Sequence, residues 1–131
     1  MLRTISVIFC VLFLFATCQD NPYQQGYYLY QNYCSNCHMD DGTGLGKNIP
    51  TLVQADYIAQ NRLLLPCIVR HGLVDTIVVN GLTYTEAMPG FPKLSEAEIA
   101  NIINYMLHEW NGEVEELNMK EVKDGLENCN P

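Results

Sequence analysis

Two cysteines and a histidine stand together in the stretch Cys34-Ser35-Asn36-Cys37-His38. Two thiols at this spacing can add across the two vinyl groups on one edge of a haem. A histidine directly after the second thiol then lies under the ring, where its imidazole can bind iron. The stretch therefore predicts one covalently attached haem, with His38 as an axial ligand.

Three other kinds of chemistry use similar residues. Zinc would need further ligands, and although His71 and His108 are available, the chain has no second paired-ligand motif. A thioredoxin-like redox pair is expected in βαβ surroundings, which the sequence pattern lacks. A structural disulfide between Cys34 and Cys37 would be a poor staple across two residues. Covalent haem is the favoured interpretation.

The ligand on the other face of the iron decides the chemistry. A methionine thioether raises the reduction potential, whereas an open position permits ligand binding. Met88 lies in an irregular loop and is the candidate, with a gap-filling core methionine as the alternative. Met39 adjoins His38 and cannot easily reach the opposite face, Met106 falls on the apolar stripe of a helix, and Met119 lies in an acidic tail.

The elements that must position these residues follow from periodicity, turn residues and caps. Asn-Gly is typical of a tight hairpin turn, and Ser95 with Glu98 forms a capping-box pattern. Pro66 indicates a kink or a late start in its helix. The predicted elements are a helix over 24–34, a glycine-rich loop over 40–50, a helix over 61–71 capped by Asn61, a hairpin over 76–84, an irregular segment over 87–94, a helix from Ser95 to about Asn111, and a short helix after Asn118 with Glu121 in its first turn.

The N-terminal residues predict export. Residues 1–17 hold one basic residue followed by an apolar run that is too short to span a bilayer comfortably, with an uncleaved membrane anchor as the alternative. Cys18 follows small residues at the end of that run, which resembles a bacterial lipoprotein signal. Acylated Cys18 would then hold the protein at a membrane surface, with residues 18–22 as a tether. Ordinary cleavage that leaves Cys18 free is the alternative.

The charge of the chain excludes one class of partner. The formal net charge is −8, and loss of the signal segment would make it more negative. Binding to nucleic acid needs basic residues that neutralise phosphates, so no nucleic-acid partner is expected. An acidic surface suits solubility or a basic patch on a partner protein. The acids are dense in residues 113–131, which are predicted to form an acidic C-terminal extension.

Residues 23–112 resemble a class I c-type cytochrome. Gly26 and Tyr30 stand eight and four residues before Cys34, as the small and aromatic residues of that family do. The resemblance implies an all-α cytochrome c fold of four or five helices around one covalent haem, with a minor β-hairpin near 76–84. It also implies that the first helix crosses the last main helix at Gly26, against an aromatic residue that Tyr105 would supply.

The resemblance extends to the haem contacts. Pro50 stands twelve residues after His38, where the family's proline gives its carbonyl to the imidazole. Leu52 matches an apolar haem contact. The stretch VNGLTYTEAMPGFPKLSEAEIANIINYM (79–106) resembles the end of the family's sequence, with Met88 as the axial sulfur. This part is similar to cytochromes that accompany periplasmic dehydrogenases and terminal oxidases.

The function implied is single-electron transfer outside the cytoplasm, with no enzymatic activity and no small-molecule substrate. The expected donor is a dehydrogenase or a quinol-oxidising complex, and the expected acceptor is a terminal oxidase or reductase. A lipidated Cys18 would keep the protein on the periplasmic side of a membrane. The alternatives are a tethered subunit of a larger oxidoreductase complex, and a haem sensor or peroxidase in which Met88 is labile.

Two further groups of residues carry open interpretations. Cys67 and Cys129 are candidates for a disulfide that pins the acidic tail to the body, against two free thiols or an intermolecular bridge. Arg70, Lys47 and Tyr84 are candidates for contact with the haem propionates, and solvated surface is at least as good an interpretation of each.

Overall fold

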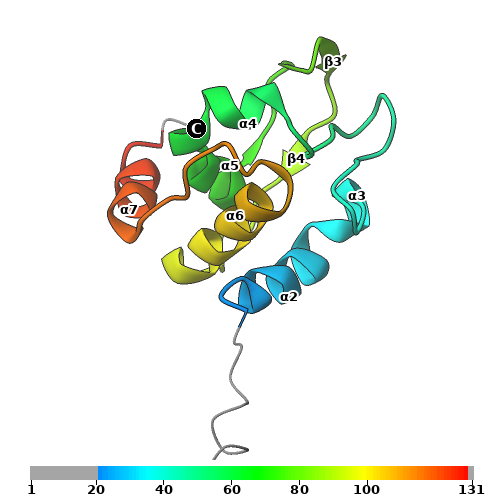
Figure 1. The fold of residues 1–131 in the computed structure, drawn as a ribbon. Coiled ribbons are helices and arrows are strands. Elements are labelled where there is room, and N and C mark those ends of the chain that lie inside the picture. Colours follow the sequence, from blue (N-terminus) through cyan, green and yellow to red (C-terminus); the bar gives the residue numbers. More distant parts are fainter. Residues whose placement is uncertain (1–20, 130–131) are drawn as a thin grey trace, which may run out of the picture.

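The structure, a computed structural model, describes residues 21–129, so the predicted signal segment and Cys18 lie outside the described residues. No helix within that part of the chain is long and apolar enough to cross a membrane. Figure 1 shows the helices packed together, with the few strands at the upper right of the view. The elements are α2 (Gln24–Tyr33), α3 (Ser35–His38), α4 (Asp56–Gln60), η1 (Arg62–Leu64), α5 (Leu65–His71), β1 (Gly72–Leu73), β2 (Ile77–Val79), β3 (Leu82–Tyr84), β4 (Met88–Pro89), α6 (Glu96–Trp110) and α7 (Met119–Glu127).

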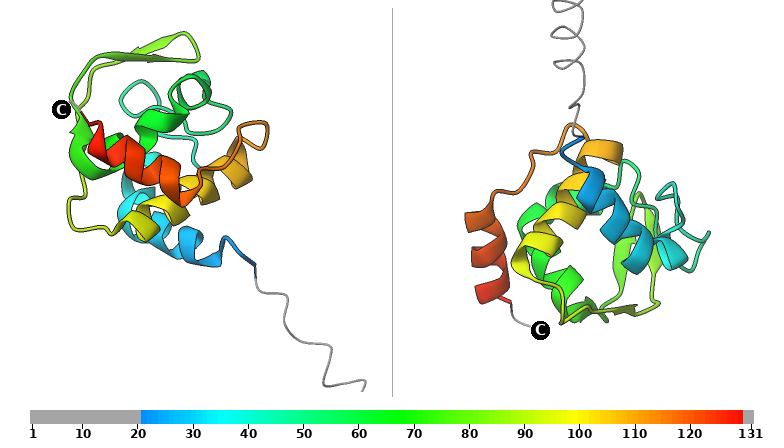
Figure 2. Two further views of the ribbon diagram at one scale, coloured as in Figure 1. Left: turned by 90° about the vertical axis from the view of Figure 1, so that its left-hand side faces the viewer. Right: turned by 90° about the horizontal axis from the view of Figure 1, so that it is seen from below.

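Helices α2 and α6 cross closely, and the crossing is set by a glycine (Figure 2). A Cβ at Gly26 would lie 2.2 Å from the Asn101 carbonyl oxygen and 2.6 Å from the Tyr105 Cβ. Tyr30 is fully buried one turn further on, and its ring lies 5.7 Å from that of Tyr105 and 5.0 Å from that of Trp110. The predicted crossing at Gly26 against Tyr105 is therefore present.

The predicted hairpin is confirmed as β2 and β3, which pair antiparallel. Its turn residues Asn80 and Gly81 have φ values of 50° and 79°, the left-handed conformation that an Asn-Gly turn requires. The Asn80 side chain accepts from the Asp56 amide at 3.0 Å, and Asp56 accepts from the Asn80 amide at 2.7 Å. This reciprocal pair fixes the hairpin to the start of α4.

The prediction of one helix over 61–71 is wrong. Helix α5 begins only at Leu65, with Pro66 in its first turn, where the missing N–H of proline costs no hydrogen bond. The Asn61 side chain does not cap the start of this helix. It donates to the Tyr57 carbonyl at 2.9 Å, at the end of α4. Helix α4 is not predicted from the sequence, because its five residues are too few to show a helical period.

Two other expectations differ from the structure. Residues 87–94 were expected to hold no regular structure, yet Met88 and Pro89 form β4, which pairs antiparallel with β1. A two-residue strand leaves no periodic signal in a sequence. The described residues contain six α-helices and one 3₁₀ turn, more than the four or five helices predicted, because α3 and α4 are single turns.

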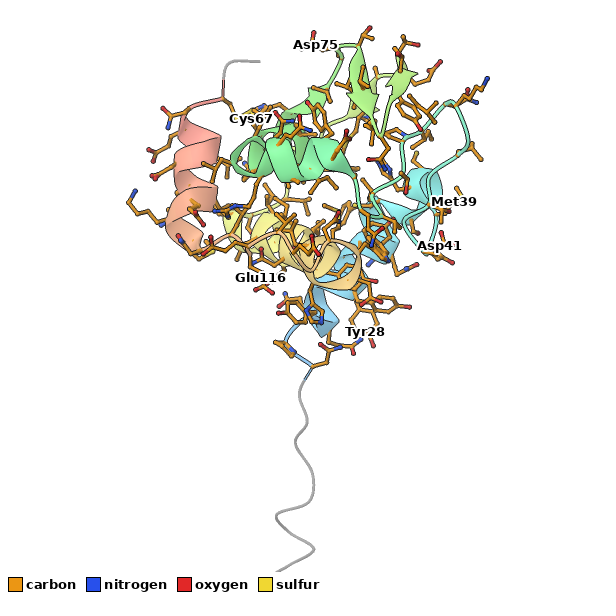
Figure 3. All side chains as sticks on the ribbon, turned by 45° about the horizontal axis from the view of Figure 1, so that its top comes forward. Tyr28, Met39, Asp41, Cys67, Asp75 and Glu116 are labelled. Atoms are coloured by element: carbon orange, nitrogen blue, oxygen red, sulfur yellow. A yellow bond between two sulfur atoms is a disulfide. The ribbon has the colours of Figure 1, made fainter. Side chains whose placement is uncertain are left out.

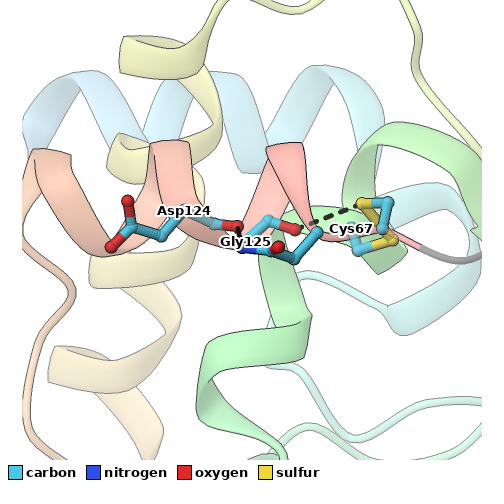
Figure 4. Close-up of a disulfide and its surroundings, with 5 residues drawn as sticks. Cys67, Asp124 and Gly125 are labelled. Atoms are coloured by element: carbon cyan, nitrogen blue, oxygen red, sulfur yellow. Dashed lines mark hydrogen bonds between the residues drawn. A yellow bond between two sulfur atoms is a disulfide. The ribbon is translucent and has the colours of Figure 1, made fainter.

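The capping boxes at both predicted helix starts are confirmed. The Ser95 hydroxyl accepts from the Glu98 amide and the Glu98 carboxylate accepts from the Ser95 amide, and Asn118 and Glu121 form the same pair at the start of α7. Helix α7 packs beside α5 and α6 (Figures 1 and 2). The structure joins Cys67 of α5 to Cys129, with 5.6 Å between their Cα atoms (Figure 4).

The close crossing predicts a stability effect. Gly26→Ala should lower the free energy of unfolding of the holoprotein by about 1–3 kcal/mol, because the new Cβ meets backbone that must move. This range is the net loss, after the gain of about 1 kcal/mol from the higher helix propensity of alanine. Denaturant titration would measure the change, and Gly112→Ala is the control, since the nearest atom to its Cβ is 3.9 Å away. A Gly26→Ala protein as stable as the parent would contradict the crossing.

Candidate functional site

The two cysteines and the histidine of the motif are held in one helical turn. Helix α2 ends at Tyr33, and the Cys34 amide still donates to the Tyr30 carbonyl at 2.8 Å. Helix α3 follows at once, with the His38 amide donating to the Cys34 carbonyl at 2.9 Å. Cys34 is buried and Cys37 is exposed, and neither forms a disulfide. Burial raises the pKa of the Cys34 thiol to about 12.

An apolar cleft opens beside this turn. Its inner part has a cavity volume of about 80 Å³ and is lined almost wholly by apolar side chains. An outer part continues toward solvent and shares with it His38, Pro50 and Met88. The inner walls come from α3, the loop after it, α5, the hairpin and α6, and their aliphatic and methionine side chains are Leu52, Ile58, Leu65, Ile68, Val69, Leu73, Ile77, Val79, Met88, Ile102 and Met106.

The imidazole of His38 is oriented by a backbone carbonyl. His38 is only 8% exposed, and its Nδ1 donates to the Pro50 oxygen at 3.1 Å. Because a carbonyl only accepts, the proton lies on Nδ1 and the lone pair on Nε2, the arrangement found in metal-ligating histidines. Burial lowers the pKa of His38, against the opposing effect of the Pro50 bond.

The loop between His38 and Pro50 is held by a close backbone contact. Gly44 has a φ of 73°, and a Cβ there would lie 2.5 Å from the Pro50 oxygen. Its amide donates to the His38 carbonyl at 3.0 Å, so the loop folds back onto the helical turn that carries the imidazole. The buried Tyr30 hydroxyl donates to the Met39 carbonyl at 2.7 Å. Both ends of the His38–Pro50 bond are thus fixed.

Met88 reaches the cleft from a separate direction. It is half-buried and lines both the inner and the outer part. Its strand β4 pairs with β1, with Leu73 opposite Met88. A Cβ at Gly72, whose φ is 84°, would lie 2.4 Å from the Met88 carbonyl oxygen. Only glycine permits this approach, so β1 and β4 form a backbone seat for Met88.

The other methionines of the described region have different places. Met106 is buried on α6 and also lines the inner cleft, so it is both a core residue and a wall residue. Met39 follows α3 and lines neither part of the cleft (Figure 3). Met119 is 44% exposed on α7. Of the methionines in the described region, only Met88 lines the cleft from a short strand pair and not from a helix.

Several other predicted site residues are placed by the structure. Leu52 lines the inner cleft and Tyr84 lines the outer part, where its hydroxyl lies 3.4 Å from the Gly46 carbonyl. Lys47 is exposed on the loop. Arg70 does not line the cleft; it borders a shallow depression on the α7 side together with Lys93 and Lys123. The contact of Arg70 with a haem propionate stays a prediction, and the structure places this residue beside α7.

The two histidines considered for zinc lie elsewhere. His71 is exposed at the end of α5. His108 stacks on the ring of Tyr23, with 3.8 Å between centroids. Neither lines the cleft. The residues that would be needed to complete a zinc site around Cys34 and Cys37 are thus placed in other contacts.

Asn111 supports the cleft, although the sequence indicates it only as a helix end. Its side chain is buried, donates to the Leu52 carbonyl at 2.8 Å and accepts from the Ala55 amide at 3.1 Å. It therefore ties the end of α6 to the loop that forms one wall of the cleft. A polar residue after a helix gives no sequence signal for such a long-range bond.

Comparison with known proteins identifies the family. A family model described as "Cytochrome C oxidase, cbb3-type, subunit III" matches residues 21–106. The chain belongs to this family of c-type cytochromes. Haem c, bound covalently and carrying iron, is its cofactor. The family match covers the cysteine–histidine turn, the cleft and Met88.

Two similar proteins agree with this assignment. Cytochrome c-552 of Thermus thermophilus is 31% identical over 81 residues, which are 59% of this chain and 62% of that protein. The cytochrome c subunit of the quinone-type alcohol dehydrogenase of Gluconobacter oxydans is 33% identical over 84 residues, which are 63% of this chain and 17% of that subunit. The chain thus covers less than two thirds of the length of either relative.

The residues of the cleft fit haem c. The walls are almost wholly apolar, as a porphyrin face requires. The unbonded Cys34 and Cys37 lie at the rim, one on the inner and one on the outer part. His38 presents Nε2 as its lone-pair nitrogen. The two thiols that would attach the haem and the His38 nitrogen that would bind its iron therefore lie together at the cleft.

Substitution of Asn111 tests whether its hydrogen bonds stabilise the wall of the cleft. Asn111→Ala should lower the free energy of unfolding by about 2–6 kcal/mol, because the Ala55 amide and the Leu52 carbonyl lose their partner, at about 1–3 kcal/mol each. Denaturant titration of the holoprotein would measure it. The matched control is Asn32→Ala, since the Asn32 side chain is exposed and makes no hydrogen bond within residues 21–129. Equal stability of the two variants would show that the Asn111 bonds are not needed.

Proposed function

We propose that this cytochrome is a single-electron carrier in which Cys34 and Cys37 attach the haem and His38 and Met88 ligate its iron. The observation that carries the proposal is that His38 and Met88 line the same apolar cleft from two different elements. The His38 ring is held by its bond to the Pro50 carbonyl, and Met88 is held by its backbone in the β1–β4 pair. Two preset ligands are what an electron carrier needs, since its iron must change charge without changing its surroundings.

The chain's contribution is burial and orientation. When bound, the haem iron supplies one-electron chemistry between its ferrous and ferric states. The apolar walls exclude water, so a change of iron charge reorders little solvent. The Pro50 carbonyl holds the His38 ring in one tautomer and increases its basicity. The thioether of Met88 favours the reduced iron and raises the potential. No bound substrate is transformed in this scheme.

The proposed setting is outside the cytoplasm. Residues 1–17 are proposed as an export signal and Cys18 as a lipidation site that holds the domain at a membrane from the periplasmic side. A dehydrogenase or quinol-oxidising complex is the proposed donor, and a terminal oxidase or reductase is the proposed acceptor. Support comes from the cytochrome subunit of a quinone-type alcohol dehydrogenase among the relatives and from the oxidase named in the family description.

The same names favour a second candidate function, a tethered subunit of a larger oxidoreductase complex. Co-purification with such a complex from native membranes would support the subunit, and a protein that is released alone by detergent would support the free carrier. A sensor or peroxidase needs an open iron face, and carbon monoxide binding to the reduced protein at neutral pH would support it.

Met88→Ala tests the carrier directly. The oxidised parent protein should show the weak near-red absorption band of methionine sulfur on ferric iron, and the variant should lose it. The reduction potential should fall by an appreciable part of the roughly 0.8 V that axial ligands span. The reduced variant should also bind carbon monoxide, because its iron face is open.

Met119→Ala is the matched control, since Met119 is exposed on α7 and lies outside the cleft. Its spectrum and potential should equal those of the parent. A Met88→Ala protein that keeps the near-red band would overturn the ligand assignment, and Met106, the other methionine of the cleft wall, would become the candidate.

A further inference from the structure

Helix α5 has two faces with different neighbours. Leu65, Ile68 and Val69 line the inner cleft. Pro66 and Cys67 face α7, and Cys67 is labelled on that side of the helix in Figure 3. A movement of α5 away from α6 would therefore change the cleft wall, and α7 lies where it would oppose that movement.

The segment 113–129, here called the C-terminal strap, is fastened to α5 and to the turn before it. Cys129 at its end is bonded to Cys67 (Figure 4). Arg62 of η1 donates to both carboxylate oxygens of Glu121, at 2.7 and 3.2 Å, and these side chains are 17% and 27% exposed. The paired charge lowers the pKa of Glu121 and raises that of Arg62. The strap thus holds η1 and the first turn of α5.

The strap is also fitted closely to this segment by shape. A Cβ at Gly125 would lie 2.8 Å from the Leu63 carbonyl oxygen and 3.3 Å from the Pro66 Cγ. Val122 is fully buried on the inner side of α7. The start of the strap is tied to α6, where Asn104 and the backbone of Leu117 exchange two hydrogen bonds of 2.9 Å. Both partners of the strap therefore carry cleft walls.

The far end of α5 carries the seat of Met88. The Phe91 amide donates to the Val69 carbonyl at 2.9 Å. A Cβ at Gly90 would lie 2.7 Å from the Arg70 carbonyl oxygen. Strand β1 continues α5 without a break and pairs with β4, which contains Met88. The backbone of Met88 and of the three residues after it therefore rests on the last turn of α5 and on β1.

We propose that the C-terminal strap positions Met88, and that it does so by clamping α5. This rests on the proposed function, in which Met88 is an iron ligand. A helix of seven residues is not stable by itself and takes its order from its neighbours. With the clamp, the last turn of α5 and the loop 88–91 hold the thioether in the cleft. Without it, this region opens locally more often, and Met88 leaves the iron more often.

The test removes the disulfide from the full-length holoprotein. In Cys67→Ser/Cys129→Ser, added imidazole should displace methionine from the ferric iron at least ten times faster than in the parent, followed as loss of the near-red band. Hydrogen exchange of the Phe91 amide should accelerate by a similar factor. Exchange of the Cys34 amide, which bonds within α2, should change much less. Neither cysteine of this pair lines the cleft.

Gly26→Ala is the control for a general loss of stability, since the nearest neighbours of Gly26 are Asn101 and Tyr105 of α6 and no residue of α5. It should accelerate exchange at Cys34 at least as much as at Phe91. Arg62→Gln keeps the disulfide and serves where the double variant does not fold; it should accelerate imidazole binding at least threefold, with partial rescue in Arg62→Lys.

The outcomes separate the two hypotheses. If the parent shows the near-red band but neither Cys67→Ser/Cys129→Ser nor Arg62→Gln changes the imidazole rate by more than twofold, the clamp is wrong and the carrier stands. If the parent lacks the band, the ligand assignment fails. Exchange at Phe91 then still decides whether the strap holds the loop: unchanged protection refutes the clamp, and selective loss of protection supports it.

Discussion

The enclosure of a large flat apolar group by a short chain is the constraint on which the rest of this structure depends. Side chains of α5, α6 and the hairpin converge on one apolar cleft, so the hydrophobic core is arranged around that cleft. A domain of this size buries limited apolar surface by itself, at about 25 cal/mol for each Å² removed from water. The cofactor is therefore part of the core, and each wall must be fixed from outside the cleft.

Polar side chains provide much of that outside support. Asn111 joins the end of α6 to the loop beside the cleft, and Asp56 with Asn80 joins α4 to the hairpin. Asn104 joins α6 to the start of the strap through Leu117. In each case a side-chain amide or carboxylate satisfies backbone groups of a distant segment, which a short irregular connection cannot do for itself. The apolar side chains face the cleft, and hydrogen bonds fix the walls from behind.

Local chemistry explains which parts were predictable from sequence. The cysteine–histidine turn, the Asn80-Gly81 hairpin and the capping boxes at Ser95 and Asn118 each depend on residues a few positions apart, and the structure contains all four. The crossing at Gly26 was accessible because the family resemblance supplied the distant partner. In the four local motifs, the spacing of the residues along the chain is enough to predict their geometry.

The rest depends on partners far along the chain. Asn61 is a residue type that often caps the start of a helix, yet its side chain bonds to the Tyr57 carbonyl in α4. Helix α5 begins at Leu65, so that Pro66 falls in its first turn. The β1–β4 pair has only two residues in each strand and exists because Gly72 and Gly90 let two backbones touch. Asn111 and Arg70 gave no signal of where their side chains would lie, since that is decided by the packing of α6 and α7.

This distinction also separates the two proposed iron ligands. His38 lies one helical turn from Cys34, and Pro50 is only twelve residues further on, so a short stretch of chain fixes that ligand. Met88 stands fifty residues beyond His38 and reaches the cleft only through the strand pair on the end of α5. A contact made through several weakly held segments opens more readily than one closed within a single turn. The long-range fastening of α5 by α7, with its disulfide and ion pair, adds a covalent bond and a charged contact behind the helix on which Met88 depends.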